Sequence, residues 1–296
     1  MASINDLATA ASAVSALAPP ATAPQSSLLD AAGSEGHGGP PAARGALVIL
    51  EGLDRSGKTT QVKLLEQRFV ELGRKVKVMR FPDRTTPIGQ MIDSYLKSQV
   101  EMDDHVIHLL FSANRWEAAK TITSLLSAGV TVICDRYYHS GIVYSAAKQN
   151  PTLTLSWARA PEVGLPRPDL VLFLDLDESQ ARARGGWGGE VYEKGAMQRR
   201  VRELFWGLSM GKIGTASVAA ADAASEPTGE EVAVGPPTPQ GLTGTEYRFR
   251  QEEEDLHVVD ASPSVEEVAE EVWKVVKARV EAVGRGEVGR QVRRVS

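Results

Sequence analysis

The stretch GLDRSGKTTQ, from Gly52 to Gln61, carries residue types that bind phosphate groups. Its spacing, G-x-x-x-x-G-K-T, follows an apolar segment and opens a helical pattern, which is the context of a P-loop. Glycines at these positions let backbone N–H groups turn toward phosphate oxygens at a helix N-terminus, where partial positive charge favours an anion. We therefore predict that a nucleoside triphosphate binds at this loop.

Two side chains of the loop have distinct predicted roles. Lys58 would reach the outer phosphates, and the hydroxyl group of Thr59 would help to hold Mg²⁺. A glycine turn that only caps a helix is the structural alternative. The residues predicted to contact the triphosphate are Gly52, Leu53, Ser56, Gly57, Lys58, Thr59 and Thr60.

A carboxylate, Asp54, and an arginine, Arg55, lie inside this loop. A carboxylate facing a polyphosphate is repelled unless other groups hold it, and the repulsion grows as water is excluded. Asp54 therefore needs a hydroxyl donor or cationic neighbours. An ordinary ion pair with a lysine or arginine of the loop is the simpler alternative.

Charged residues follow two other apolar segments. In CDRYYHSG, Asp135 ends a segment at which its carboxylate could hold Mg²⁺, and Arg136 could bind phosphate with two hydrogen bonds. In RFPDR, Arg84 has the same position after another segment. Surface ion pairs between Asp135 and Arg136, and between Asp83 and Arg84, are the alternative.

The number of cations expected around the site exceeds the need of one triphosphate. Lys58 and one or two arginines suffice for that ligand. The excess indicates a second anionic group, and an acceptor that itself carries a phosphate fits this condition. The cations are Arg55, Lys58, Arg84 and Arg136, with Arg115 nearby.

These residues need a scaffold that brings strand ends together. Short apolar runs rich in β-branched residues alternate with segments of helical period, which predicts a parallel sheet covered by helices on both faces. The α/β class with a P-loop NTPase fold follows from this alternation. The predicted strands are 46–52, 75–81, 130–135, 169–176 and 255–261.

Composition divides the chain of 296 residues into a domain and three other segments. Residues 1–44 are dominated by Ala, Pro, Ser and Gly and are predicted to be a disordered tail, with a transit peptide as the alternative. The domain spans 45–283 and contains a disordered insertion at about 212–246. The basic end, 284–296, is predicted to be a solvated tail, with a partner site as the alternative.

The overall charge and the cysteine content restrict the setting. A formal net charge of -5 gives no general attraction to nucleic acid or to anionic membranes, and no apolar run approaches the roughly 20 residues of a membrane span. The single cysteine, Cys134, lies in an apolar run and suits a reducing compartment, although a reactive thiol is the alternative. We predict a soluble cytoplasmic protein, with the nucleus as a further location and mitochondria as a weaker alternative.

Six motifs in order resemble the thymidylate kinase family, whose members transfer the γ-phosphoryl group of ATP to dTMP. They are EGLDRSGKTTQ, RFPDR, HLLFSANRWE, VICDRYYHSG, GLPRPDLVLFLDL and YEKGAMQ, and with their connections they cover 46–210 and 255–283. The resemblance implies a five-stranded parallel sheet flanked by helices, Mg²⁺ with ATP as cofactor and donor, and a homodimer.

The resemblance also assigns roles within the P-loop. Asp54 matches a carboxylate that faces the acceptor and takes up the 3′-hydroxyl group of dTMP. Arg55 matches an arginine that reaches the transferring phosphate. The residues implied in catalysis are Arg55, Lys58, Asp54 and Arg136.

The motif FSANRW implies a thymine pocket. Phe111 and Arg115 are four residues apart on one helix face, so a ring could stack on the base while a guanidinium donates to its O4 carbonyl. Spacing alone would equally allow a core phenylalanine and a solvated arginine. Leu96 resembles an apolar border of this pocket, and Tyr144 resembles an aromatic residue that crowds the sugar 2′ position. The residues implied in dTMP binding are Asp54, Arg84, Leu96, Phe111, Arg115, Arg136, Gly141, Tyr144, Tyr192 and Gln198.

The glycine-rich segment 182–198 resembles the lid of the family. Arg184 matches an arginine that lies against adenine in ATP, and Tyr192 and Gln198 match acceptor-side and closing contacts. Val191 departs from relatives that have an arginine there, so Arg55 is expected to supply the catalytic arginine.

Three classes of function stay open on sequence alone. The nearest rival to a dTMP kinase is another deoxynucleoside or nucleotide kinase, but an acceptor without phosphate would leave Arg84 and Arg136 unexplained. A P-loop binding protein without catalysis is disfavoured by the presence of Lys58, Thr59 and Asp135. A scaffold role of the low-complexity segments would make activity incidental.

Overall fold

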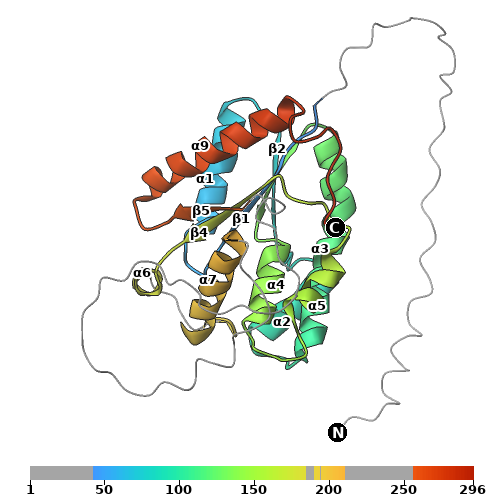
Figure 1. Cartoon of the computed structure of the whole chain (residues 1–296), viewed down its shortest axis with the longest axis vertical. Coiled ribbons are helices and arrows are strands. Elements are labelled where there is room, and N and C mark those ends of the chain that lie inside the picture. Colours follow the sequence, from blue (N-terminus) through green and yellow to red (C-terminus); the bar gives the residue numbers. More distant parts are fainter. Residues whose placement is uncertain (1–42, 185–189, 194, 211–255) are drawn as a thin grey trace, which may run out of the picture. The chain divides into compact units, whose positions relative to one another are not determined.

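The computed structural model describes residues 43–184, 190–193, 195–210 and 256–296 (Figure 1). They belong to one compact unit, Ala42–Ser296. The predicted insertion, nearly all of the predicted N-terminal tail, and lid residues 185–189 and 194 lie outside the described residues.

Five parallel strands form one sheet in the order β2-β3-β1-β4-β5. The predicted fold class is confirmed, and each strand lies within its predicted range. Strand β1 is the middle strand of this order, and all six of its residues are buried. Near-continuous apolar strands fit a sheet that is covered on both faces. The strands are β1 Leu47–Gly52, β2 Val76–Arg80, β3 Thr131–Asp135, β4 Leu170–Asp175 and β5 Leu256–Asp260.

Helices α1 and α9 cover one face of the sheet, and α3, α4 and α7 lie on the other (Figure 1). Side chains alternate along β1, so that Val48 and Leu50 pack with α1 and α9, whereas Leu47 and Ile49 pack with α3, α4 and α7. Both faces are therefore dry cores. The helices are α1 Lys58–Glu71, α9 Val265–Gly284, α3 Asp104–Ser127, α4 Tyr138–Ala146 and α7 Gly195–Ser209.

A smaller apolar cluster lies where helix α2, Pro87–Leu96, packs against the start of α3. Its buried members are Ile92, Tyr95, Leu96 and Ile107. Both helices begin with a side-chain cap, since Thr86 accepts from Gly89 N and Asp103 accepts from His105 N. The remaining helical segments are α5 Leu155–Arg159, η3 Ala160–Glu162 and α6 Glu178–Ala183.

The register of the sheet places the predicted chemistry at one edge. Leu50 of β1 pairs with Asp135 of β3, and Gly52 of β1 pairs with Leu174 of β4. The carboxyl ends of three neighbouring strands therefore meet around the loop that follows Gly52. This is where ligands bind in open α/β sheets.

A buried arginine–carboxylate pair fastens the opposite edge of the sheet. Arg44 donates Nη1 to Asp169 Oδ2 at 2.7 Å and Nη2 to Oδ1 at 2.8 Å, and Leu47 N donates to the same carboxylate at 2.9 Å. Asp169 immediately precedes β4, and Leu47 begins β1. This pair therefore fixes how the two central strands start.

The basic end of the chain packs against the domain, so the expectation of a solvated tail is wrong. Val295 is only 3% exposed, and its backbone bonds with Gly164 N at 2.8 Å and Leu165 O at 2.9 Å. Arg293 accepts from Arg167 N through its carbonyl and donates to Pro168 O through Nη2. The physical reason is that valines recur among the arginines of this segment and bury their side chains, while the charged groups bond to backbone carbonyls.

Across the described ranges, none of the helices combines the length and the apolar character needed to span a membrane.

Candidate active site

A cavity of about 690 Å³ opens at the carboxyl ends of the strands. The P-loop forms its floor, β2, α2, α3 and α4 border one end, and the start of α9 borders the other. Most residues predicted for the site line this cavity. Three do not: Gly52, Leu53 and Gln198 act on lining residues from behind.

Lys58 lies buried in the P-loop and donates to the carbonyl groups of Gly52, at 3.0 Å, and Leu53. Burial and, to a smaller extent, the nearby Arg136 lower the pKa of Lys58 to about 7, against the opposing effect of the surrounding carboxylates. A phosphate placed beside this amine would favour its charged form. An anion bound beside Lys58 would therefore raise the pKa of its amine.

Gly52 and Gly57 of the P-loop occupy positions at which only glycine fits without strain or steric overlap. Gly57 has φ of 94°, in the left-handed region that favours glycine. A Cβ atom on Gly52 would lie 2.6 Å from Ser56 Oγ and 2.7 Å from Leu174 O. Neither position accepts a side chain without displacing the loop.

Asp54 has partners from outside the loop. Arg136 Nη2 donates to Oδ1 at 2.6 Å, Gln198 Nε2 donates to Oδ2 at 2.9 Å, and Tyr144 OH lies 3.5 Å from Oδ2. Burial by itself raises the pKa of Asp54, but Arg136, Lys58 and Gln198 together hold that pKa below its usual range. The ion pair of Asp54 is with Arg136, from the end of β3, while Lys58 of the loop acts on it as a neighbouring charge.

Arg136 joins the P-loop to the end of β3. Its Nη1 donates to Gly52 O at 3.1 Å and to Ser140 Oγ at 3.0 Å, and its guanidinium lies 5.2 Å from the ring centroid of Tyr144. The backbone of Arg136 has φ of 69°, a strained value for a side-chain-bearing residue. Arg136 forms its ion pair with Asp54, so the alternative of a surface pair with Asp135 is wrong.

Asp135 and Thr59, the two residues predicted to hold the metal, have their side-chain oxygens in contact. Thr59 Oγ1 donates to Asp135 Oδ2 at 2.8 Å, and Asp135 is only 4% exposed. No group of three or more His, Cys, Asp or Glu residues that could hold a metal occurs in the described part of the chain. Mg²⁺ suits such a sparse site, because it is usually held by one or two carboxylates together with substrate phosphates and water.

Arg84 is held between two carboxylates. Its Nη1 donates to Asp93 Oδ1 at 2.6 Å, and its Nη2 donates to Glu190 Oε1 at 2.7 Å. Asp83, proposed as an alternative partner, instead accepts from Thr85. Arg84 lines the cavity, and an acceptor phosphate would have to compete with these two carboxylates for it.

Arg115 is 2% exposed and lines the cavity together with Phe111 and Leu96, so the alternative of a solvated arginine is wrong. Its guanidinium is paired with Glu162, a residue of η3. Gly141 lies directly beside this guanidinium, because a Cβ atom there would be 2.7 Å from Arg115 Nη2.

Tyr192 and Gln198 connect the lid segment to the P-loop. The ring of Tyr192 packs 5.4 Å from that of Tyr144 and 6.0 Å from that of Tyr95. Gln198 is fully buried and donates to Tyr192 O at 2.8 Å, while its Oε1 accepts from Asp54 N at 3.2 Å. Gln198 therefore contacts Asp54 through both atoms of its amide.

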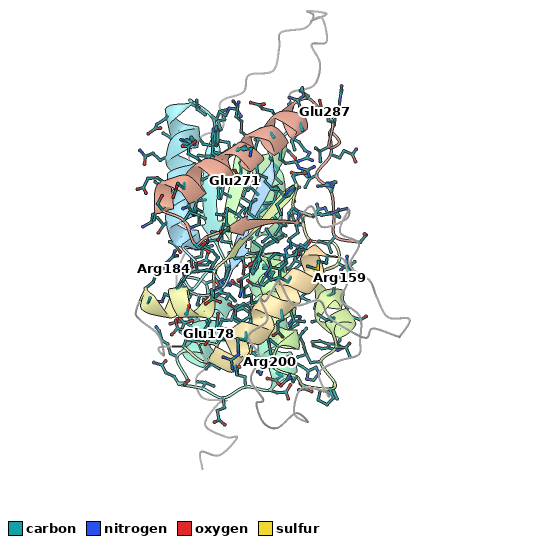
Figure 2. The ribbon with its side chains drawn as sticks, turned by 60° about the vertical axis from the view of Figure 1, so that its left-hand side comes forward. Arg159, Glu178, Arg184, Arg200, Glu271 and Glu287 are labelled. Atoms are coloured by element: carbon teal, nitrogen blue, oxygen red, sulfur yellow. The ribbon has the colours of Figure 1, made fainter. Side chains whose placement is uncertain are left out.

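Arg184 lies at the end of α6 (Figure 2) and bridges to the other end of the cavity. Its Nη1 donates to Arg55 O at 3.1 Å, and its Nη2 donates to Ala261 O at 2.9 Å. Arg55 is exposed and has φ of 68°. The apolar residues at this end are Ala261, Pro263, Val265 and Val268.

Sequence reasoning missed four glutamates at or behind the cavity. Glu51 is fully buried behind the P-loop, where it accepts from Tyr137 N at 2.9 Å and from Ser140 N at 3.1 Å. A glutamate inside the apolar strand LVILEG was a usable signal for it. Glu162, Glu190 and Glu193 lie in loops or short turns, where one charged residue is not distinctive.

The chain resembles known proteins over this part of its length. Residues 50–225 match the sequence model described as thymidylate kinase. The chain is 50% identical to a thymidylate kinase of Danio rerio over 162 residues, which are 55% of this chain and 76% of the relative. It is 48% identical to one of Homo sapiens over 164 residues, again 55% of this chain and 76% of the relative.

A solved structure of thymidylate kinase from Candida albicans is also similar. It superposes with a TM-score of 0.63 at 30% sequence identity, and the match covers 86% of this chain and 100% of that one.

Proposed function

The chain belongs to the thymidylate kinase family, and from this premise we propose that it transfers the γ-phosphoryl group of ATP to dTMP through the residues described above. It is a P-loop phosphotransferase. The observation that carries the proposal is the ion pair between Asp54 and Arg136, which joins the P-loop to the acceptor end within one cavity.

The donor nucleotide binds at the P-loop. Backbone N–H groups that follow Gly52 surround the phosphates, and Lys58 turns from its two carbonyl partners to the outer phosphates. Arg184 lies against the adenine, with the apolar residues at the start of α9 on the other side. Both contacts position the γ-phosphoryl group toward the acceptor end.

The acceptor occupies the opposite half of the cavity. Arg84, whose pairs with Asp93 and Glu190 are partly exposed and can be exchanged for a ligand, binds its phosphate together with Arg136. Phe111 stacks on the base while Arg115 donates to the O4 carbonyl. Asp54 accepts from the 3′-hydroxyl group, and Tyr144 restricts space at the 2′ position. With the acceptor placed in this way, Arg84, Arg115 and Arg136, which one triphosphate alone would not need, each have a ligand group to bind.

Catalysis consists mainly of positioning and charge stabilisation, because phosphoryl transfer needs little covalent help from the protein. Arg55, Lys58 and Arg136 surround the path between the two nucleotides and stabilise charge that develops on the transferring group. Tyr192 lines the acceptor end and helps to exclude water from it, while Gln198 holds Tyr192 and Asp54 in place from behind.

Thr59 and Asp135 would hold Mg²⁺. Their hydroxyl and carboxylate oxygens are 2.8 Å apart, so both could bind one small cation, whose other ligands would be water and phosphate oxygens. When bound, the ion would neutralise part of the phosphate charge.

A coupled ADP-release assay against a panel of acceptors tests the function. With ATP and Mg²⁺ we expect turnover of dTMP to exceed that of thymidine, AMP and CMP by orders of magnitude, because only dTMP satisfies both the base contact and the phosphate contact. Omission of Mg²⁺ should abolish turnover. A preference for thymidine over dTMP would instead identify a deoxynucleoside kinase, and turnover of none would leave a binding protein.

The predicted homodimer is supported by an apolar stripe on α3. Val106, Leu109 and Trp116 are 50%, 46% and 42% exposed, and their spacing of three and seven places them on one face. Such a face suits a second copy of the chain. Leu109→Glu should therefore convert dimers to monomers in analytical ultracentrifugation, whereas Thr121→Glu, at an exposed polar position of the same helix, should not. A monomeric wild type at micromolar concentration would refute the dimer.

A further inference from the structure

We propose that Glu162 is a positioning residue that makes Arg115 a reader of a single carbonyl group, and so sets the preference for thymine over cytosine. This inference rests on the proposed function. Glu162 does not line the cavity, so it acts only through Arg115.

Glu162 holds the guanidinium of Arg115 by two parallel hydrogen bonds. Arg115 Nε donates to Oε2 at 2.9 Å, and Nη2 donates to Oε1 at 2.5 Å. The side chains of Arg115 and Glu162 are 2% and 0% exposed. A bidentate pair fixes the plane of the guanidinium as well as its position.

The third nitrogen of the guanidinium is left for a ligand. Among the described residues, no hydrogen bond is formed by Arg115 Nη1. A Cβ atom on Gly141 would lie 3.0 Å from this nitrogen, and both residues line the cavity. The free donor therefore lies along the cavity wall, where glycine leaves room for it.

The turn that carries Glu162 is itself fixed by α3. Ser112 Oγ donates to Pro161 O at 3.2 Å, and Trp116 Nε1 donates to the same carbonyl at 2.8 Å. These two residues flank Arg115 on the helix. The element that carries the arginine therefore also holds its carboxylate partner in place.

Arg115 is the cation that pairs with Glu162, because the other titratable neighbour, His108, is neutral. His108 Nε2 lies 4.0 Å from Glu162 Oε1. The pKa of His108 is lowered to about 4, mainly by burial and next by the positive charge of Arg115. His108 is thus neutral near pH 7 and does not compete. Its two nitrogens bond instead with Ser145 Oγ, at 2.7 Å, and Ala158 O, at 2.8 Å.

This arrangement determines which ligand group suits Arg115. A neutralised guanidinium with one free amino group is a poor phosphate site, which would use two donors and a net positive charge. It is a suitable donor to one carbonyl oxygen. Thymine and uracil present a carbonyl at C4, whereas cytosine presents an amino group, which would leave two donors facing each other.

The free-energy cost of burying the Arg115–Glu162 pair also supports a role in orienting the guanidinium. A buried ion pair is seldom more stabilising than apolar residues of equal volume, because two charges must be removed from water. Holding a guanidinium in one orientation at the cavity wall is a use that apolar residues cannot serve. The orientation of Arg115 is therefore the function that we assign to Glu162.

The test compares kcat/KM for dTMP, dUMP and dCMP in wild type and in Glu162→Gln. The amide retains the size of the side chain but loses the charge and one acceptor, so Arg115 is free to tilt. We expect the dTMP to dCMP ratio to fall by about tenfold or more. The dTMP to dUMP ratio should not change, since both bases carry the O4 carbonyl, and the KM for ATP should stay within about twofold.

Asp169→Asn is the matched control, because Asp169 forms an equally buried bidentate pair with Arg44 at the other edge of the sheet. It should lower the melting temperature and leave all three substrate ratios unchanged. If Glu162→Gln does not fold, Glu162→Asp carries the same test, since the shorter side chain draws the guanidinium away from the wall and should also lower the dTMP to dCMP ratio.

The outcomes separate the two levels of the argument. A folded Glu162 variant that retains the wild-type dTMP to dCMP ratio would overturn the role of Glu162 and leave the kinase function standing. A wild type that prefers dCMP to dTMP would overturn the proposed function, and the role of Glu162 with it. A lower ratio confined to the Glu162 variants supports the proposal.

Discussion

Lys58→Ala should lower kcat for dTMP on the order of 10³-fold or more, because it removes the one buried cation of the P-loop that is placed to stabilise charge on the transferring phosphoryl group. The measurement is steady-state turnover with saturating ATP and Mg²⁺. Near-wild-type turnover in a cleanly folded variant would refute the P-loop mechanism.

Stability provides the control for this variant. The pKa of Lys58 in the folded chain, about 7, lies below its ordinary value of 10.5, so the unfolded chain binds more protons between these values. The free energy of unfolding of the wild type should therefore rise with pH from about 7 toward 10.5. Lys58→Ala should lack this rise and should be at least as stable as the wild type at pH 7. Thermal melts at pH 7 and pH 9 check both points.

Asp54→Asn should lower kcat/KM for dTMP by about 10- to 100-fold, the usual effect of losing a hydrogen bond to a charged group. The amide keeps the size of the carboxylate but cannot offer the same charge to the 3′-hydroxyl group or to Arg136. The loss should be clearly smaller with 3′-deoxy-dTMP, which has no hydroxyl group to donate. Both substrates are compared in the same assay.

The control for this prediction is Asp93→Asn, which removes a different carboxylate at the acceptor end. Asp93 pairs with Arg84, on the predicted phosphate side. Its loss should affect dTMP and 3′-deoxy-dTMP to the same extent. If Asp54→Asn also reduced both substrates equally, Asp54 would organise the loop and Arg136, and its contact with the sugar would have to be abandoned.

The sheet and the P-loop could be predicted because their signals are local. The central strands are nearly continuous apolar runs, and the strand, glycine spacing and helix around Lys58 follow one another directly between Leu47 and Glu71. The predicted strand ranges are each slightly longer than the observed ones, since residues at strand ends keep β propensity outside the ladder.

The partners of the site arginines could not be predicted, because they are distant in sequence. Arg115 and Glu162 are 47 residues apart, and Arg84 and Glu190 are 106 apart. No periodicity links such pairs, and composition does not show which carboxylate reaches which guanidinium. The residue roles at this site therefore stay predictions until the variants are measured.

The basic end was mispredicted for a different reason. Its arginines dominated the composition, whereas Val295 and the backbone decided the outcome by bonding with Gly164 and Leu165. The contact is an isolated β-bridge between Pro166 and Arg294, and no periodic pattern of residues marks a single bridge in a sequence. A charge count describes a segment's solubility, but not whether its backbone finds partners.

Gln198 bonds to Asp54 through both amide atoms, and Asp54 in turn bonds to Arg136. One chain of contacts thus runs from α7, through the P-loop, to the end of β3, and each nucleotide is expected to touch part of it. Any shift that ATP produces in this chain changes the affinity for dTMP by some factor. Thermodynamic linkage requires dTMP to change the affinity for ATP by the same factor. Each substrate is therefore an effector of the other. An inhibitor that binds at one nucleotide site should likewise bind with an affinity that depends on whether the other site is occupied.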